Sequence, residues 1–361
     1  MAMKAKILCL PGGMPRSLEY LRSVDQGAVE VIGASSEKYD VSRKSYQQWY
    51  YIPHITHPDF AQSLIELVKR QQISQLFTPH QVIWNFVQEL VLENGLELTL
   101  VNTQPIETEL QPYQEYFESG QELFESTLPL AAASSGKKKL LPIQYASLFR
   151  HAQTIPGETD GSKIAALCEV MRYCPPGDII EIGVLWGKSA FVLAYLAKNY
   201  SIGPILCIDP WNRNYLPQGS ELLMKYSSNT HDISSALSIF QMNLLPYGCG
   251  NINYRQSPSN EAFRDYCSNF FVKSQAFGLT IYSGSVALLH IDGNHAYEFV
   301  RQDLALWQKK VCPGGWVVLD DYCWMFGNGP QKAGDSFILN NRERIQCAFV
   351  MGGALFFQFR I

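Results

Sequence analysis

Apolar runs and amphipathic segments alternate along the first hundred residues. Apolar runs predict four strands, at Ala5–Leu10, Val29–Ser35, Ser74–His80 and Leu96–Val101. Apolar side chains at helical spacing predict helices over Pro15–Val24 and from a capping Asp59 to about Gln72. Because strands and helices alternate, we expect a small α/β domain with a parallel sheet and covering helices.

The alternation returns after about residue 160, where seven strands are expected. Helical segments separate the first six, and Gly352-Gly353 between the last two signals a hairpin turn. Parallel strands followed by an antiparallel hairpin indicate a Rossmann-like seven-stranded α/β sheet. The seven runs are Asp178–Gly183, Pro204–Asp209, Ile252–Ser257, Val286–Asp292, Gly315–Asp321, Ile345–Met351 and Ala354–Phe359.

The segment between the two halves loses its periodicity. It is rich in Gln and Glu and leads to AAASSGKKK, Ala131–Lys139, whose lysines we interpret as solvated. We therefore expect an α/β domain over residues 1–105, a linker with some helix over 106–150, and the Rossmann-like domain over 151–361.

Composition narrows the class of protein. The formal net charge of −4 offers no electrostatic case for binding nucleic acid or an anionic membrane surface. No apolar run approaches the roughly 20 residues that span a bilayer, and Pro11 interrupts the apolar N-terminal run, which argues against a signal peptide. The nine cysteines form no C-x-x-C pair, which is typical of reduced thiols in a cytoplasmic protein.

The stretch EIGVLWGKSA, Glu181–Ala190, joins a predicted strand to a predicted helix. Its ending resembles a P-loop, but three residues rather than four separate Gly183 from Gly187, which disfavours ATP. NAD remains possible, although G-x-G-x-x-G is absent. S-adenosylmethionine fits best, because its carboxylate suits the amide-rich turn near Ser189 and its ribose suits Asp209 at the next strand end.

Three carboxylates are expected at one edge of the sheet. Asp292 ends the fourth predicted strand, and Asp320 and Asp321 end the fifth. Adjacent parallel strands bring their ends together, and carboxylates this close repel one another. We therefore expect Mg²⁺ or another divalent cation between them. The alternative is that one aspartate caps a helix while another faces water.

Two histidines lie near this edge. His295 follows Asp292 by three residues, on a loop bordering the carboxylates, and is a candidate general base. His290 lies inside the apolar strand, and we interpret it as a core residue that points elsewhere.

Four motifs in order resemble class I S-adenosylmethionine-dependent methyltransferases. They are EIGVLWGKSA, CIDPW, IDGNHAYEFVRQDLALW and PGGWVVLDDY. They are most similar to the metal-dependent O-methyltransferases of the macrocin and cephalosporin-tailoring group, over about Pro156–Ile361. The resemblance implies a cofactor site at Glu181, Gly183, Gly187, Ser189, Asp209, Gln256 and Ser257, a metal at Asp292, Asp320 and Asp321, and His295 as base.

The resemblance implies an O-methyltransferase acting on a hydroxyl of a small molecule, such as a sugar, a polyketide or a catechol-like natural product. The insertion Asn212–Gly250, with Tyr215, Leu216 and Tyr226, is a candidate lid, and Cys323–Pro330 is a candidate opposite wall. The alternatives are an NAD-dependent oxidoreductase and a non-catalytic module that binds S-adenosylmethionine. A homo-oligomer is also possible.

The N-terminal half resembles the small α/β domain that precedes the catalytic part of ATP-grasp ligases. The resemblance rests on element order and on the YQQWYYIP connection. No ATP-grasp domain follows, so ligase activity is not implied. The PGG stretch at Pro11–Gly13 is expected to form a tight turn, the alternative being a phosphate contact.

Overall fold

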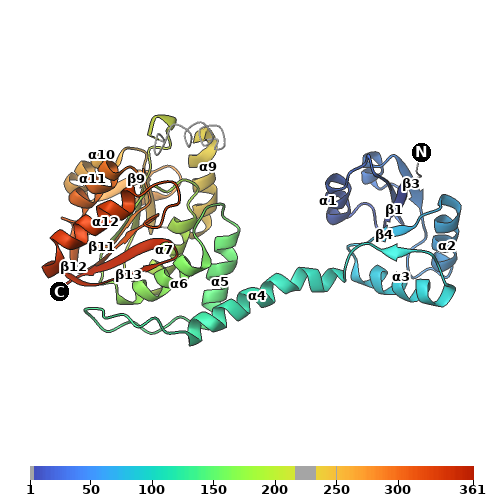
Figure 1. The fold of residues 1–361 in the computed structure, drawn as a ribbon. Helices are drawn as coiled ribbons and strands as arrows, with labels where there is room; N and C mark the ends of the chain where they lie inside the picture. Colours follow the sequence, from blue (N-terminus) through green and yellow to red (C-terminus); the bar gives the residue numbers. More distant parts are fainter. Residues whose placement is uncertain (1–3, 216–232, 249) are drawn as a thin grey trace. The chain divides into compact units, whose positions relative to one another are not determined.

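The computed structural model describes residues 4–215, 233–248 and 250–361, and the chain divides into two compact units, Met1–Glu115 and Tyr116–Ile361 (Figure 1). Leu216 and Tyr226 of the candidate lid lie outside the described residues. Among the described residues, no helix combines the length and apolar character needed to cross a bilayer.

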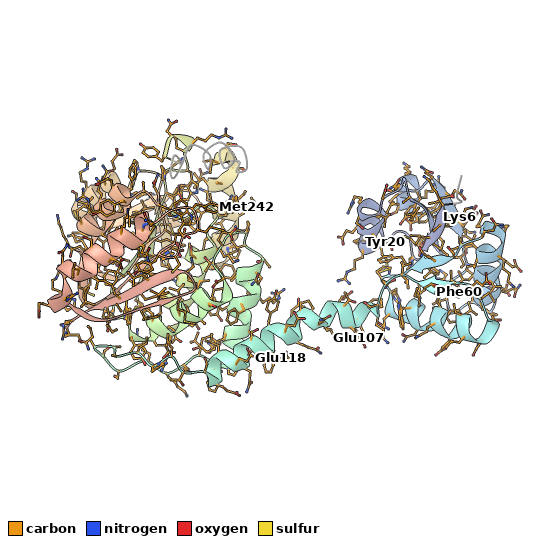
Figure 2. All side chains as sticks on the ribbon, viewed as in Figure 1. Lys6, Tyr20, Phe60, Glu107, Glu118 and Met242 are labelled. Atoms are coloured by element: carbon orange, nitrogen blue, oxygen red, sulfur yellow. The ribbon has the colours of Figure 1, made fainter. Side chains whose placement is uncertain are left out.

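Unit 1 is an α/β domain with a parallel sheet in the order β3-β2-β1-β4-β5. The expected strands and helices are present, and β3 and α3 are additional. Phe60, labelled in Figure 2, begins α2 and is 2% exposed in the core that α2 and α3 form with the sheet. The elements are β1 (Ala5–Cys9), α1 (Pro15–Ser23), β2 (Val29–Ser35), β3 (Gln48–Tyr51), α2 (Phe60–Gln71), β4 (Gln75–Phe77), α3 (Gln81–Asn94) and β5 (Thr99–Leu100).

Two local expectations for unit 1 need correction or refinement. Asp59 occupies the N-cap position of α2, but its side chain makes no capping hydrogen bond, so the expected cap is wrong. The PGG stretch is a turn, and its Gly12 amide donates to Ala34 O on the neighbouring strand at 2.7 Å. A Cβ on Gly13 would lie 2.2 Å from the Asp40 carboxylate, so a negatively charged side chain lies against this turn.

The expected linker is mostly ordered. Helix α4 (Pro105–Glu125) spans the boundary between the units and exposes acidic side chains such as Glu107 and Glu118 (Figure 2). Helix α5 (Pro142–Gln153) follows and buries Tyr145 and Leu148 in the core of unit 2. The structure therefore places residues 140–150 within unit 2 rather than in a linker, because their apolar side chains pack against α7.

Unit 2 contains a seven-stranded sheet in the order β13-β14-β12-β11-β6-β7-β8, and all seven expected strands are present. Strand β14 runs antiparallel to both of its neighbours, and the other pairs are parallel. A small hairpin, β9 (Phe271–Ser274) with β10 (Gly278–Ile281), was not expected. The seven strands are β6 (Asp178–Ile182), β7 (Ile205–Ile208), β8 (Ile252–Arg255), β11 (Val286–Ile291), β12 (Val311–Leu319), β13 (Ile345–Met351) and β14 (Ala354–Phe359).

Helices cover both faces of this sheet (Figure 1). One face packs in a core with α5, α6 (Gly161–Val170), α7 (Lys188–Asn199) and α9 (Ile233–Leu244). The other face packs against α10 (Ser259–Ser268), α11 (Tyr297–Trp307) and α12 (Gly329–Asn340). Side chains alternate between faces along a strand, so each central strand supplies both cores.

The Gly352-Gly353 hairpin turn is confirmed. Both residues have positive φ, 56° and 74°, which is the conformation that a two-residue turn of this kind requires. A Cβ on Gly352 would lie 2.4 Å from the amide nitrogen of Lys163. The turn therefore lies directly against the first turn of α6, at the edge of the sheet where strands β6, β11 and β12 end.

Candidate active site

A cavity of about 580 Å³ opens beyond the carboxyl ends of β6, β7, β11 and β12. Its volume is within the range of pockets that hold a small-molecule cofactor or substrate. The predicted residues Gly183, Gly187, Ser189 and Asp209 line one part of it. Asp292, His295, Asp320 and Asp321 line another part, together with Lys163.

The two glycines of the EIGVLWGKSA turn are required by the protein itself. Gly183 has φ 81°, and a Cβ there would lie 2.0 Å from the carbonyl oxygen of Asp292. Gly187 has φ 89°, and a Cβ there would lie 2.6 Å from Leu244. Each glycine therefore makes room for a neighbouring chain segment, besides lining the cavity.

Asp209 is expected to bind the ribose of the cofactor, but its carboxylate is largely engaged. Oδ2 accepts the Val184 and Leu185 amides at 2.9 and 3.0 Å, and Oδ1 accepts the Trp211 amide at 2.7 Å. Burial raises the pKa of Asp209, against the lowering effect of these three amides. Each carboxylate oxygen has two lone pairs, so Oδ1 retains capacity for one hydroxyl.

The remaining predicted cofactor residues differ in their access to the cavity. Ser189 is 5% exposed and lines it at the start of α7. Gln256 is exposed and, like Ser257, is not among the lining residues. The lining there comes instead from the next four residues, Pro258 to Glu261, which carry the chain from β8 into α10.

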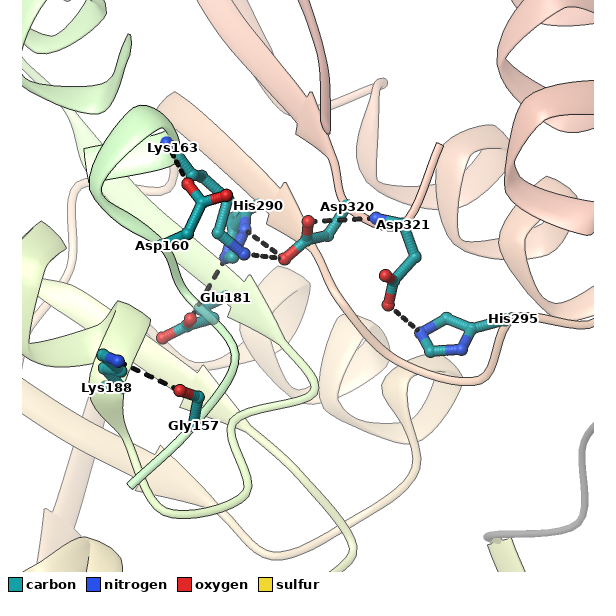
Figure 3. Close-up of polar contacts among 9 residues, drawn as sticks. All are labelled: Gly157, Asp160, Lys163, Glu181, Lys188, His290, His295, Asp320 and Asp321. Carbon is teal, nitrogen blue, oxygen red and sulfur yellow. Dashed lines mark hydrogen bonds and ion pairs between the residues drawn. The ribbon is translucent and has the colours of Figure 1, made fainter. Parts of the chain in front are cut away.

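Glu181 lies beneath the cavity and contacts His290. The register of β6 and β11 pairs Glu181 with His290, and both side chains point to the face covered by α6 (Figure 3). Glu181 Oε1 is 3.1 Å from His290 Nδ1, and both side chains are fully buried. Glu181 is not among the residues that line the cavity, so its expected contact with the cofactor is replaced in the structure by a contact with His290.

The expectation that His290 points away from the acidic site is wrong. Its Nε2 atom lies 3.7 Å from Asp320 Oδ2, an ion-pair contact longer than a hydrogen bond. Burial alone would lower the pKa of His290, but Asp320 and Glu181 raise it to about 9. The apolar neighbours in the sequence VALLHID concealed this role, because only the strand register shows which face His290 occupies.

Lys163 lines the cavity beside the aspartates and was not expected from the sequence. It belongs to the first turn of α6, is 4% exposed, and its Nζ donates to Asp320 Oδ2 (Figure 3). Burial would lower the pKa of Lys163, but Asp292 and Asp320 raise it. The sequence separation of 157 residues between Lys163 and Asp320 left no local signal for this pair.

The pKa values of Asp320 and Asp292, at the edge of the sheet, are shifted in opposite directions. Burial would raise the pKa of Asp320, yet His290 and Lys163 hold it well below its usual range. Burial and the neighbouring Asp320 raise the pKa of Asp292. The two groups lie side by side because β11 and β12 pair Ile291 with Leu319, the residues immediately before them.

Asp321 points away from Asp320 and toward His295. Its Oδ2 lies 2.8 Å from His295 Nε2, and its backbone has φ 50°, an uncommon conformation for a residue with a side chain. Such strained residues cluster at functional sites. His295 also contacts the Trp324 ring edge-on, with centroids 4.7 Å apart.

Among the described residues, two groups of side chains could hold a metal ion, each with ligand atoms within 4.8 Å of one another. One comprises His290, Asp292 and Asp320, and the other comprises Asp292, His295 and Asp321. Asp292 belongs to both, whereas the predicted trio of aspartates is divided between them. Carboxylate oxygens with an imidazole nitrogen suit a divalent cation such as Mg²⁺ or Mn²⁺.

A second hollow adjoins His295 on the other side. Its volume is about 500 Å³, and Trp324, Phe326, Asn328 and Lys332 help to line it. These residues come from the Cys323–Pro330 loop, which is expected to be a substrate wall, and from α12. Trp324 and Phe326 pack edge-on, with ring centroids 5.9 Å apart.

A family comparison supports a methyltransferase domain within unit 2. Residues 180–322 match the sequence model of a methyltransferase-domain family, and this range contains all three aspartates, His295 and the whole EIGVLWGKSA stretch. The match is to a methyltransferase domain, and the seven-stranded sheet with its terminal hairpin is consistent with a Rossmann-like methyltransferase fold. A search of curated proteins found no significant match.

Solved structures with similar folds are methyltransferases at low identity. The O-methyltransferase NovP is 18% identical, with 52% of this chain and 73% of that chain covered and a TM-score of 0.35. The calicheamicin methyltransferase CalS11 is 15% identical. The match covers 72% of this chain and 94% of that chain, with a TM-score of 0.41. MycE, solved with Mg, SAH and mycinamycin VI, is 17% identical. The match covers 51% of this chain and 45% of that chain, with a TM-score of 0.30.

Proposed function

We propose that this protein transfers the methyl group of S-adenosylmethionine to a hydroxyl oxygen of a small molecule, with assistance from a divalent cation. The observation that carries the proposal is the single cavity shared by two kinds of residues. The glycine turn and Asp209 line one part of it, and the Asp292, Asp321 and His295 side chains line the other. A methyl donor bound at the first part would lie beside the groups that activate an acceptor at the second.

His295 is the proposed general base. Its Nε2 lies 2.8 Å from Asp321 Oδ2, a contact that would hold the ring in place while the imidazole takes the hydroxyl proton. The carboxylate also stabilises the imidazolium that forms, as in other His–Asp pairs. A positioned base of this kind contributes roughly 10²- to 10⁴-fold in rate.

The proposed metal ligands are Asp292, Asp320 and Asp321. A divalent cation bound there would lower the pKa of a coordinated hydroxyl. The protein's own part is to hold acceptor and donor in one cavity at a fixed geometry, which supplies much of the remaining acceleration.

The proposed acceptor is a sugar, polyketide or catechol-like compound with neighbouring oxygens. Two neighbouring oxygens can share one cation, and the Trp324 and Phe326 rings beside His295 offer an apolar wall for a ring to stack on. The half-buried position of His295 between the two hollows supports an acceptor that enters from the Trp324 side.

Two measurements test this function. Calorimetric titration of the full chain should detect binding of S-adenosylhomocysteine and none of NAD; the reverse preference would support the oxidoreductase alternative instead. Incubation with methyl-labelled S-adenosylmethionine, Mg²⁺ and a panel of sugar, polyketide and catechol acceptors should then give an O-methylated product by mass spectrometry. Cofactor binding with no transfer to any acceptor would favour a non-catalytic module.

A further inference from the structure

The second hollow differs in charge from the cavity on the other side of His295. Three aspartates line the cavity beside this histidine, Asp292, Asp320 and Asp321. Among the residues that the structure describes, no aspartate or glutamate lines the second hollow, and Lys332 brings an ammonium group to it. His295 lines both, so it stands between an acidic side and a basic side.

The packing of α12 fixes where Lys332 starts. Helix α12 begins at Gly329, and a Cβ on Gly329 would lie 2.1 Å from the carbonyl oxygen of His295. The first turn of α12 therefore lies directly against the backbone of the proposed base. Lys332 follows Gly329 by three residues, a spacing that puts both on one side of a helix. Its backbone amide donates to Asn328 O at 2.9 Å, which completes this turn.

The ammonium group of Lys332 is available to a ligand. Its side chain is exposed, and within the described ranges no carboxylate forms an ion pair with it. The acidic side chain three residues further along α12, Asp335, accepts the Tyr322 hydroxyl at 2.6 Å. Glu298, in the first turn of α11, pairs with Arg301 instead.

The second hollow is large enough to hold more of an acceptor than the ring that is methylated. Its volume of about 500 Å³ falls within the roughly 300 to 1,000 Å³ of ordinary small-molecule sites. Trp324 is half-buried and Phe326 is exposed, so their rings offer apolar surface to a ligand between His295 and Lys332. An acceptor that reacts at His295 would therefore extend along these rings toward the lysine.

We propose that the acceptor carries a negatively charged group, a phosphate or a carboxylate, beyond the ring that is methylated, and that Lys332 binds this group. The inference rests on the proposed function and deepens it by naming the charge of the substrate. An acceptor bound the other way round would turn its negative group toward the three aspartates, and like charges repel. Lys332 is thus a positioning residue that directs the hydroxyl, rather than the charged end, to His295.

Binding of matched probes tests this proposal without a catalytic assay. The full-length protein, saturated with S-adenosylhomocysteine and Mg²⁺, is titrated calorimetrically with two pairs of compounds that differ in charge. Protocatechuate and 4-methylcatechol test a carboxylate, and glucose 1-phosphate and methyl glucoside test a phosphate. The variants are Lys332→Met, which removes the charge, and Lys332→Arg, which keeps it. Lys309→Met is the matched control, because Lys309 is exposed and lines neither the cavity nor the second hollow.

Wild type is expected to bind the charged member of at least one pair about fivefold or more tightly than the neutral member, as one partly exposed ion pair would give. The pair that shows this preference identifies the group as a carboxylate or a phosphate. Lys332→Met is expected to lose the preference while its affinity for the neutral member stays within twofold. Lys332→Arg and Lys309→Met are expected to keep it, and raised salt is expected to weaken it.

Equal affinity of wild type for both members of each pair, or binding of neither, would overturn the proposal. A preference that survives in a folded Lys332→Met, checked by circular dichroism melting, would also overturn it, since the bound cation would then be what holds the negative group. The methyltransferase assignment depends on binding of S-adenosylhomocysteine, which is measured first and alone. The two claims therefore fail separately.

Discussion

Asp303 on α11 is a buried carboxyl group that lines the cofactor cavity, and its replacement by Asn makes a quantitative prediction. Asp303 is only 9% exposed. Burial raises the pKa of its carboxyl group to about 6, although a hydrogen bond with Ser259 lowers it. The folded protein therefore binds a proton between about pH 4 and 6 that the unfolded chain has released. Stability consequently falls as pH rises through this window and stays lower above it.

The size of the effect follows from the pKa. A rise from 3.8 to about 6 corresponds to about 3 kcal/mol of unfolding free energy lost above pH 6. Asp303→Asn is isosteric and has no proton to release. It should be more stable than wild type at pH 8, by up to about 3 kcal/mol, and should lose most of this advantage at pH 4.

Urea unfolding at pH 4.5 and pH 8, followed by tryptophan fluorescence, measures the difference. Asp265→Asn on the exposed side of α10 is a matched control from the same unit, and it should leave the unfolding free energy nearly unchanged at both pH values. An Asp303→Asn variant that is no more stable than wild type at pH 8, or whose gain does not shrink at low pH, would refute the reasoning.

Three further predictions concern the site. His295→Ala should retain binding of S-adenosylhomocysteine in calorimetry while its kcat falls roughly 10²- to 10⁴-fold, and a fully active variant would exclude His295 as the base. Chelation with EDTA should abolish methyl transfer and added Mg²⁺ should restore it, whereas transfer indifferent to chelator would remove the cation from the mechanism. Gly183→Ala should lower the melting temperature more than Gly353→Ala. Both glycines have positive φ, but only a Cβ at Gly183 would meet a neighbour, the carbonyl oxygen of Asp292 at 2.0 Å. Equal losses would mean that the crowding at Gly183 is relieved without cost.

The fold was largely predictable because its strands are short apolar runs bounded by turn residues. All seven strands of the large sheet follow from such runs, and Gly352-Gly353 identified the antiparallel hairpin. The β9–β10 hairpin was missed because Phe271–Ser274 and Gly278–Ile281 are mostly exposed and carry a weak apolar pattern.

The site was predictable only in outline. Strand ends bring Asp292, Asp320 and Asp321 to one edge, as their positions in sequence imply. Which way each side chain points depends on register and on the helix packed above it, and neither is encoded locally. His290 and Lys163 were missed for this reason, and Asp209 is held by backbone amides whose approach depends on the folded turn.

The central claim is that S-adenosylmethionine and a divalent cation occupy one cavity side by side. Nuclear magnetic resonance of methyl-¹³C S-adenosylmethionine bound to the full-length protein tests it most directly, with Mn²⁺ added as a paramagnetic probe. The account predicts that Mn²⁺ strongly broadens the bound methyl signal in wild type and does so far less in Asp292→Asn. A bound methyl signal that stays sharp in wild type at saturating Mn²⁺ would contradict it.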